Sequence, residues 1–134
     1  MTPEAYIQQQ CEAFIKTCRD MGLDMKWNFQ LSEMANLDVA KNLLWQERPA
    51  EELGNAVAIM WGAYFSQIIA EHYISRWNVD PESKLPILVV KCGNRGIQLK
   101  TIILGAQAFN QDRTFVDLWQ ETEQLLTESG AEKK

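Results

Sequence analysis

The chain has 134 residues, of which 46% are hydrophobic and 23% are charged, and its formal net charge is −5. This length predicts a single domain over residues 1–134, and the apolar share excludes a disordered or collagen-like chain. The acidic balance argues against a nucleic-acid partner, because affinity for nucleic acid comes mainly from neutralised phosphates.

The first predicted helix covers residues 3–21. Thr2 supplies a capping hydroxyl, and Pro3 suits the first helical position. Apolar residues then recur at helical spacing up to Met21, and Gly22 suits a left-handed helix end. The pattern therefore predicts an amphipathic helix with one apolar stripe.

The three cysteines, Cys11, Cys18 and Cys92, form no CxxC pair. Cys11 and Cys18 lie about 10 Å apart along a helix, which is too far for a disulfide. They are interpreted as small core residues in a reducing compartment. No signal peptide is visible, so we expect a cytoplasmic location. The single histidine leaves no zinc-like cluster, and no metal or cofactor is expected.

Residues 23–31 alternate between apolar and polar side chains, which suits either a short strand or an extended linker. We favour the linker, because only one clear sheet region follows. Ser32 or Asn36 then caps a second helix, whose apolar face ends before Pro49. Trp45 falls off that apolar face and is the best candidate for an exposed tryptophan.

The third predicted helix, residues 49–73, is apolar around much of its circumference, which indicates a central buried helix. Pro49 suits its first position, and Glu51 and Glu52 suit its first turn. Residues 53–70 carry no charge, but glycines and polar residues interrupt them, so we expect no membrane span and no membrane partner. Gly62 lies mid-helix and predicts the close approach of another backbone.

The hydrophobic period then changes from helical spacing to alternation. β-Branched and alternating residues predict strands at 75–79, 85–92 and 97–99, with a turn over residues 93–96. Residues 97–109 fit either a strand or a helix, and we favour a short strand entering a short helix.

An amphipathic helix closes the chain over residues 113–128, capped by Thr114 or Asp112. Residues 129–134 are expected to be a frayed tail. Together the elements predict an α+β fold, with about four main helices packed on a small two- or three-stranded antiparallel sheet in the second half.

The stretch from Arg76 to Arg113 holds six basic and three acidic residues, against the acidic trend of the chain. A solvated sheet edge guarded by Lys and Arg is the favoured interpretation. An anion site is the alternative.

The section from about residue 36 to residue 126 resembles a group of small bacterial domains of unknown function. Their pattern is a helix with Gly-Ala-Tyr-x-Gly-Glu, followed by a strand entry of Gly-Gly-x-Trp. The matching residues here are Gly62-Ala63-Tyr64 and Trp77, whereas Ser66-Gln67 and Ile74-Ser75 replace the remaining motif residues. The resemblance implies a shared fold and transfers no activity.

No nucleophile stands beside a positioned base in any known motif, so no catalytic residue is predicted. The remaining signal is aromatic and polar residues that suit a groove for a ligand or partner: Trp45, Tyr64, Gln67, His72, Arg76 and Trp77. The favoured hypothesis is a non-catalytic interaction module that binds another protein or a second copy of the chain. The alternative is a small-molecule binder or enzyme with a pocket between the central helix and the sheet.

Overall fold

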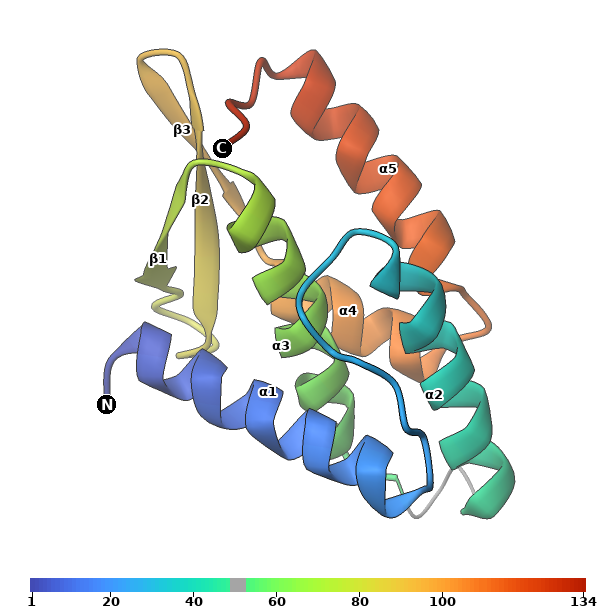
Figure 1. Cartoon of the computed structure of the whole chain (residues 1–134). Helices are drawn as coiled ribbons and strands as arrows, with labels where there is room; N and C mark the ends of the chain where they lie inside the picture. The colour runs from blue at the N-terminus through green and yellow to red at the C-terminus, as the bar shows by residue number, and fades with distance from the viewer. Residues whose placement is uncertain (49–52) are drawn as a thin grey trace.

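The computed structural model describes residues 1–48 and 53–134. Within these ranges, five helices accompany one three-stranded sheet (Figure 1). The helices are α1 (Pro3–Asp20), α2 (Glu33–Glu47), α3 (Asn55–His72), α4 (Thr101–Asn110) and α5 (Phe115–Glu128), and the strands are β1 (Ser75–Val79), β2 (Pro86–Cys92) and β3 (Arg95–Leu99). The predicted α+β class is confirmed. The helix predicted after the third strand is α4.

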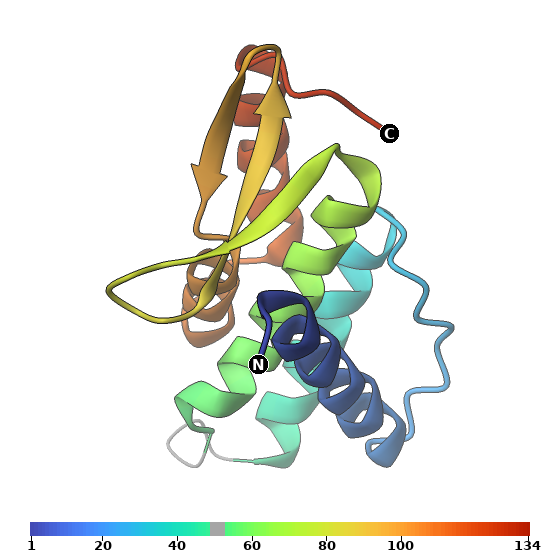
Figure 2. The same cartoon turned by 90° about the vertical axis from the view of Figure 1, so that its left-hand side faces the viewer.

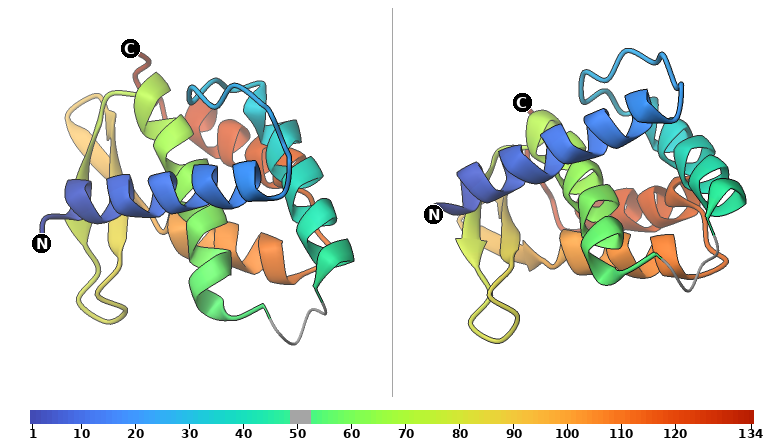
Figure 3. Two further views of the ribbon diagram at one scale, coloured as in Figure 1. Left: turned by 60° about the horizontal axis from the view of Figure 1, so that its bottom comes forward. Right: turned by 90° about the horizontal axis from the view of Figure 1, so that it is seen from below.

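Helix α1 lies across α3 and reaches the sheet with its N-terminal end (Figure 3). The Thr2 hydroxyl accepts a hydrogen bond from the Ala5 amide at 3.1 Å, with Pro3 in the first turn as predicted. Gly22 follows the helix with φ +81°. This helix forms one wall of the site described below.

Residues 23–31 form the linker that was predicted, without a strand, because no neighbouring strand pairs with them. Its apolar side chains pack against the core from outside. Trp27 meets Phe14 edge-on, with ring centroids 4.9 Å apart. The period-two pattern therefore marks an extended segment whose alternate side chains point inward.

Helix α3 is the centre of the molecule, and most of its side chains are buried. The predicted start at residue 49 is wrong in part, since Gly54 has an extended backbone and the helix begins at Asn55. Pro49, Glu51 and Glu52 lie outside the described residues. No helix in the described part of the chain combines the length and the apolar character that a membrane span requires.

The predicted close approach at Gly62 is confirmed, and the partner is α4. A Cβ atom placed on Gly62 would lie 2.3 Å from the carbonyl oxygen of Ile102. A Cβ on Gly105 would lie 2.6 Å from the Cα of Gly62. The two helices therefore touch backbone to backbone, which explains a glycine in a helix interior.

The sheet is antiparallel with the order β1-β2-β3. Trp77 pairs with Leu88 and Leu88 with Leu99, so these three residues share one face. That face joins the core and contacts α1 and α4. The hairpin between β2 and β3 turns at Gly93, with φ +63°.

Helix α2 binds the ends of two other helices through one acidic and one basic side chain. The Asp38 carboxylate accepts hydrogen bonds from the first amides of α5, at Phe115 (2.6 Å) and Val116 (3.2 Å). The Lys41 ammonium donates to three carbonyl oxygens at the end of α4 and in the following loop, at distances of 2.7–3.0 Å. The carboxylate lies at the positive N-terminal end of the α5 dipole, and the ammonium lies at the negative C-terminal end of the α4 dipole. Both contacts are therefore favourable and stabilise the α4–α5 connection.

The tail after α5 differs from the predicted frayed end. The Ile74 amide donates to the Glu132 carbonyl at 2.8 Å, and the Glu132 amide donates to the Lys91 carbonyl at 3.0 Å. Tyr73 and Lys133 form an isolated antiparallel bridge. The tail thus forms backbone hydrogen bonds with Ile74, just before β1, and with Lys91 of β2. The polar composition of the tail could not indicate this pairing.

Candidate functional site

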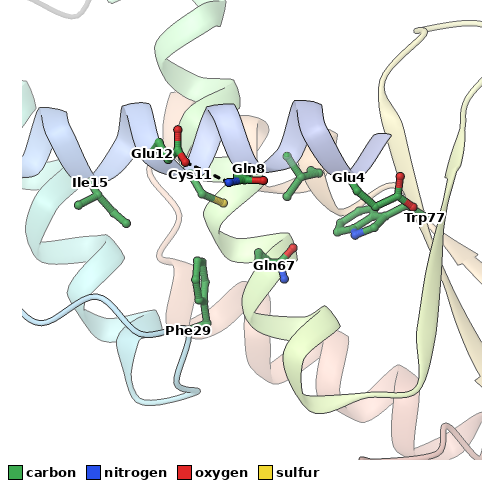
Figure 4. A pocket seen from close by; sticks show the side chains of 9 residues that line it. Glu4, Gln8, Cys11, Glu12, Ile15, Phe29, Gln67 and Trp77 are labelled. Atoms are coloured by element: carbon green, nitrogen blue, oxygen red, sulfur yellow. Dashed lines mark hydrogen bonds between the residues drawn. The ribbon is translucent and has the colours of Figure 1, made fainter. Parts of the chain in front are cut away.

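A pocket of about 470 Å³, called the groove here, opens between α1, the linker, α3 and β1 (Figure 4). One wall is α1, and opposite it stand Phe29 from the linker and Gln67 from α3. Trp77 of β1 lies at the end of the groove beside Glu4. The full lining is Glu4, Ile7, Gln8, Cys11, Glu12, Ile15, Phe29, Gln67 and Trp77.

The α1 wall follows from helical spacing. Residues 4, 8, 11, 12 and 15 recur every three or four positions and so face one side of the helix. The apolar members Ile7 and Cys11 are buried, whereas Glu4 and Glu12 are exposed at the rim. The Gln8 side-chain amide donates to the Glu12 carboxylate at 3.2 Å. The wall therefore has an apolar floor and an acidic, hydrogen-bonding rim.

Phe29 forms the opposite wall in a left-handed backbone conformation, with φ +61°. Its amide donates to the Tyr64 hydroxyl at 3.2 Å, and its carbonyl accepts from His72 Nε2 at 2.9 Å. Its ring stacks on the Tyr64 ring with centroids 4.8 Å apart. A non-glycine residue in this region is strained and persists only when its surroundings hold it, so α3 fixes this wall.

A buried carboxylate lies behind that wall. Glu33 is 3% exposed and accepts hydrogen bonds from the Asn28 amide at 3.1 Å, from the Gln30 amide at 2.8 Å and from the Tyr64 hydroxyl. Burial and the hydrogen bond to Glu33 raise the pKa of Tyr64 above its usual value, so the hydroxyl stays a donor. Sequence reasoning missed Glu33, because an acid in a first helical turn is usually a dipole partner on the surface.

The structure does not bring the six predicted groove residues together. Gln67 and Trp77 line the groove, and Tyr64, fully buried, supports it from behind. His72 holds the Phe29 carbonyl and is absent from the lining. Arg76 lines a different pocket, because adjacent residues of a strand point to opposite faces.

Trp45 lies apart from the groove, and the expectation of an exposed side chain is wrong. It is half-buried, and its ring meets Phe109 with centroids 6.0 Å apart. The Lys41 ammonium stands 5.4 Å from the ring centroid. Trp45 lies off the apolar face of α2 because it packs against α4. The spacing of apolar residues within α2 gives no information about that second contact.

The groove offers little for covalent chemistry. Burial, with a smaller effect of Glu12, raises the pKa of the Cys11 thiol to about 12, so the nucleophilic thiolate is suppressed. No imidazole or lysine is found among the nine lining residues. Within the described residues, no three His, Cys, Asp or Glu side chains gather as a metal site.

No family model, curated protein or solved structure matches this chain. The resemblance to small bacterial domains therefore stays a prediction. The candidate site rests on geometry alone.

Proposed function

We propose that the protein is a non-catalytic binding module that holds a small ligand with an apolar body in the groove. The observation that carries this proposal is the strained backbone of Phe29, which hydrogen bonds with Tyr64 and His72 of α3 hold at the wall of the groove. A volume of about 470 Å³ falls within the range of about 300–1,000 Å³ that is usual for ligand pockets.

The lining also supports a choice of ligand chemistry. Trp77, Phe29 and Ile7 offer apolar and aromatic contact, and the side-chain amides of Gln8 and Gln67 offer hydrogen bonds. The ionisable rim groups, Glu4 and Glu12, are both carboxylates. A ligand with an ammonium group beside an aromatic or aliphatic body fits these walls best.

An interaction module that binds through an exposed Trp45 has less support, because that side chain is half-buried. The large hydrophobic residues that are exposed in the described ranges include Val39, Val79 and Leu125, from three different elements. Scattered exposed residues of this kind need no partner to explain them. The groove is therefore the preferred binding surface.

The three cysteines are buried and free. Free thiols are typical of a reducing compartment. They support the proposal of a cytoplasmic location.

Three probes with one body and different head groups test the proposed binding: 3-phenylpropylamine, 3-phenylpropanol and 3-phenylpropionate. Amide chemical shifts of ¹⁵N-labelled protein are followed during each titration. We expect saturable shifts in α1, near Phe29 and in β1, with the amine bound more tightly than the carboxylate. Failure of all three probes to saturate these signals contradicts the proposal.

Two half-buried tryptophans provide a matched pair of variants. Trp77→Ala removes an aromatic wall of the groove and should weaken binding of the amine by about fivefold, since aromatic packing is worth about 1 kcal/mol. Trp45→Ala removes a ring elsewhere in the molecule and should leave the affinity within about twofold. Equal losses in both variants would point to a general effect on folding and not to binding in the groove.

A further inference from the structure

The outer face of the sheet carries a second pocket, distinct from the groove. Figure 2 shows the three strands in front, with the helices α4 and α5 behind them. A hollow of about 260 Å³ on this face is lined by Ile74, Ser75, Arg76, Val89, Lys91, Arg95 and Gly96. It therefore draws residues from all three strands and from the residue before β1.

Apolar side chains and a missing side chain shape the floor of this hollow. Val89 is only 6% exposed, although it faces away from the core cluster. A Cβ atom on Gly96 would lie 2.7 Å from a methyl carbon of Val89. Gly96 thus keeps open a space that any other residue would partly fill.

Three cationic residues line this hollow: Arg76 and Lys91 lie on its face of the sheet, and Arg95 borders it at the start of β3. Arg76 pairs in register with Val89, and Lys91 pairs with Gly96, next to Arg95. The hollow has no carboxylate in its lining, in a chain whose net charge is −5. An anion bound between these cations would relieve their mutual repulsion.

The two arginines are available for a ligand. Among the described residues, neither Arg76 nor Arg95 forms an ion pair. Lys91 stands 3.6 Å from the Glu132 carboxylate of the docked tail, and both side chains are partly exposed. Glu132 is thus a competitor for one of the three cations.

We infer that this hollow is an anion site for a small organic molecule bearing a phosphoryl group. A phosphate monoester carries a charge of about −1.5 to −2 at neutral pH, which suits three cations better than a single carboxylate does. Guanidinium groups bind phosphate oxygens in pairs, and the lysine adds a point charge. The hollow is larger than the phosphoryl group, so Val89 and Ile74 accommodate an apolar part of the ligand.

The test is a titration of ¹⁵N-labelled protein with phenyl phosphate and with inorganic phosphate, at an ionic strength held constant with sodium chloride. We expect saturable amide shifts at residues 74–77, 89–91 and 95–96, with phenyl phosphate bound more tightly than inorganic phosphate. Sodium chloride alone should produce no saturable shift there. Absence of saturation with both phosphates overturns the inference.

Charge variants separate a built site from general attraction. Arg76→Gln and Arg95→Gln should each weaken phenyl phosphate binding by at least about fivefold, because a charge-assisted pair of hydrogen bonds is lost. Arg19→Gln, at an exposed position on α1, is the matched control and should leave the affinity unchanged. Equal effects of all three substitutions overturn the inference.

Glu132→Gln is the most discriminating variant, because it should strengthen binding. It removes the carboxylate that competes for Lys91, and we expect an affinity gain of about twofold. Weaker binding in this variant contradicts the assigned role of Lys91.

Vesicles containing phosphatidylglycerol distinguish a soluble ligand from a membrane surface. Binding to these vesicles, without binding of either soluble phosphate, would assign the basic face to a membrane and overturn the inference of a small-molecule site.

Discussion

The contact between α3 and α4 makes Gly62→Ala the sharpest test of the fold. The new methyl group would stand 2.3 Å from the Ile102 carbonyl oxygen, whereas ordinary contacts begin at 3.4 Å. The obstacle is backbone and cannot rotate away as a side chain could. The two helices must therefore separate by about 1 Å, which weakens dispersion contacts along the shared surface.

Two opposing terms set the magnitude. Alanine is favoured over glycine in a helix interior by about 1 kcal/mol. Overpacking a core costs about 1–3 kcal/mol and occasionally more, and a clash with backbone belongs at the upper end. We therefore expect Gly62→Ala to lower the free energy of unfolding by about 2 kcal/mol, a large share of the roughly 5–15 kcal/mol that is typical of a domain.

Urea unfolding followed by tryptophan fluorescence and by circular dichroism measures this change. With a slope of about 2 kcal/mol per molar urea, the midpoint should fall by about 1 M. Gly105→Ala should behave similarly, since its Cβ would meet Gly62 at 2.6 Å. Gly54→Ala is the control without a clash, because a Cβ there meets nothing within 4 Å, and as a substitution at the N-cap of α3 it should cost no more than about 1 kcal/mol.

A Gly62→Ala variant as stable as the parent protein, or more stable, would refute this reasoning. It would mean that the gain in helix propensity exceeds the steric cost. The close backbone approach of α3 and α4 would then be wrong.

Three further outcomes follow from buried polar groups. Tyr64→Phe should destabilise the chain by about 1–3 kcal/mol in urea unfolding, because the buried Glu33 carboxylate loses one of its donors and the Phe29 amide loses its acceptor. Tyr6→Phe should change little. Lys41→Met should lower the free energy of unfolding by about 2–4 kcal/mol, and with it the thermal midpoint, since three carbonyl groups lose their donor. An unchanged thermal midpoint would contradict these three hydrogen bonds. Burial raises the pKa of the Cys11 and Cys18 thiols from 9.0 to about 12, so their contribution to stability is complete below pH 9.0 and is lost as the pH rises toward 12. Near pH ~10.5 the loss should reach about 1–2 kcal/mol per thiol, and a Cys11→Ala/Cys18→Ala variant should show a flatter pH profile.

The helices and strands were predictable where local patterns were unambiguous. Thr2-Pro3 and Gly22 mark the two ends of α1, and the alternation of apolar and polar residues at 75–79 matches β1. The start of α3 was misplaced, because proline and glutamates suggested a helix beginning before Gly54. The docked tail was missed, because its hydrogen bonds use backbone groups that every sequence supplies.

The groove was only partly predictable. Gln67 and Trp77 were identified as aromatic and polar residues near the junction of helix and sheet, and both line it. The α1 wall was missed, because its glutamates and glutamines are ordinary on the polar side of a helix. Phe29 was missed as well, since its left-handed conformation depends on hydrogen bonds with residues that lie 35 and 43 positions away.

By itself, the sequence determined the α+β class, the linker at 23–31, the position of the sheet and the need for a backbone neighbour at Gly62. These features follow from periodicity, capping residues and steric rules that act within a few residues. Tertiary structure alone decided that this neighbour is Gly105, that Glu33 is buried beside Tyr64, and that Arg76 and Trp77 line different pockets on opposite faces of the sheet. Those outcomes depend on contacts between segments far apart in the chain, whose relative placement is set by packing of the whole core.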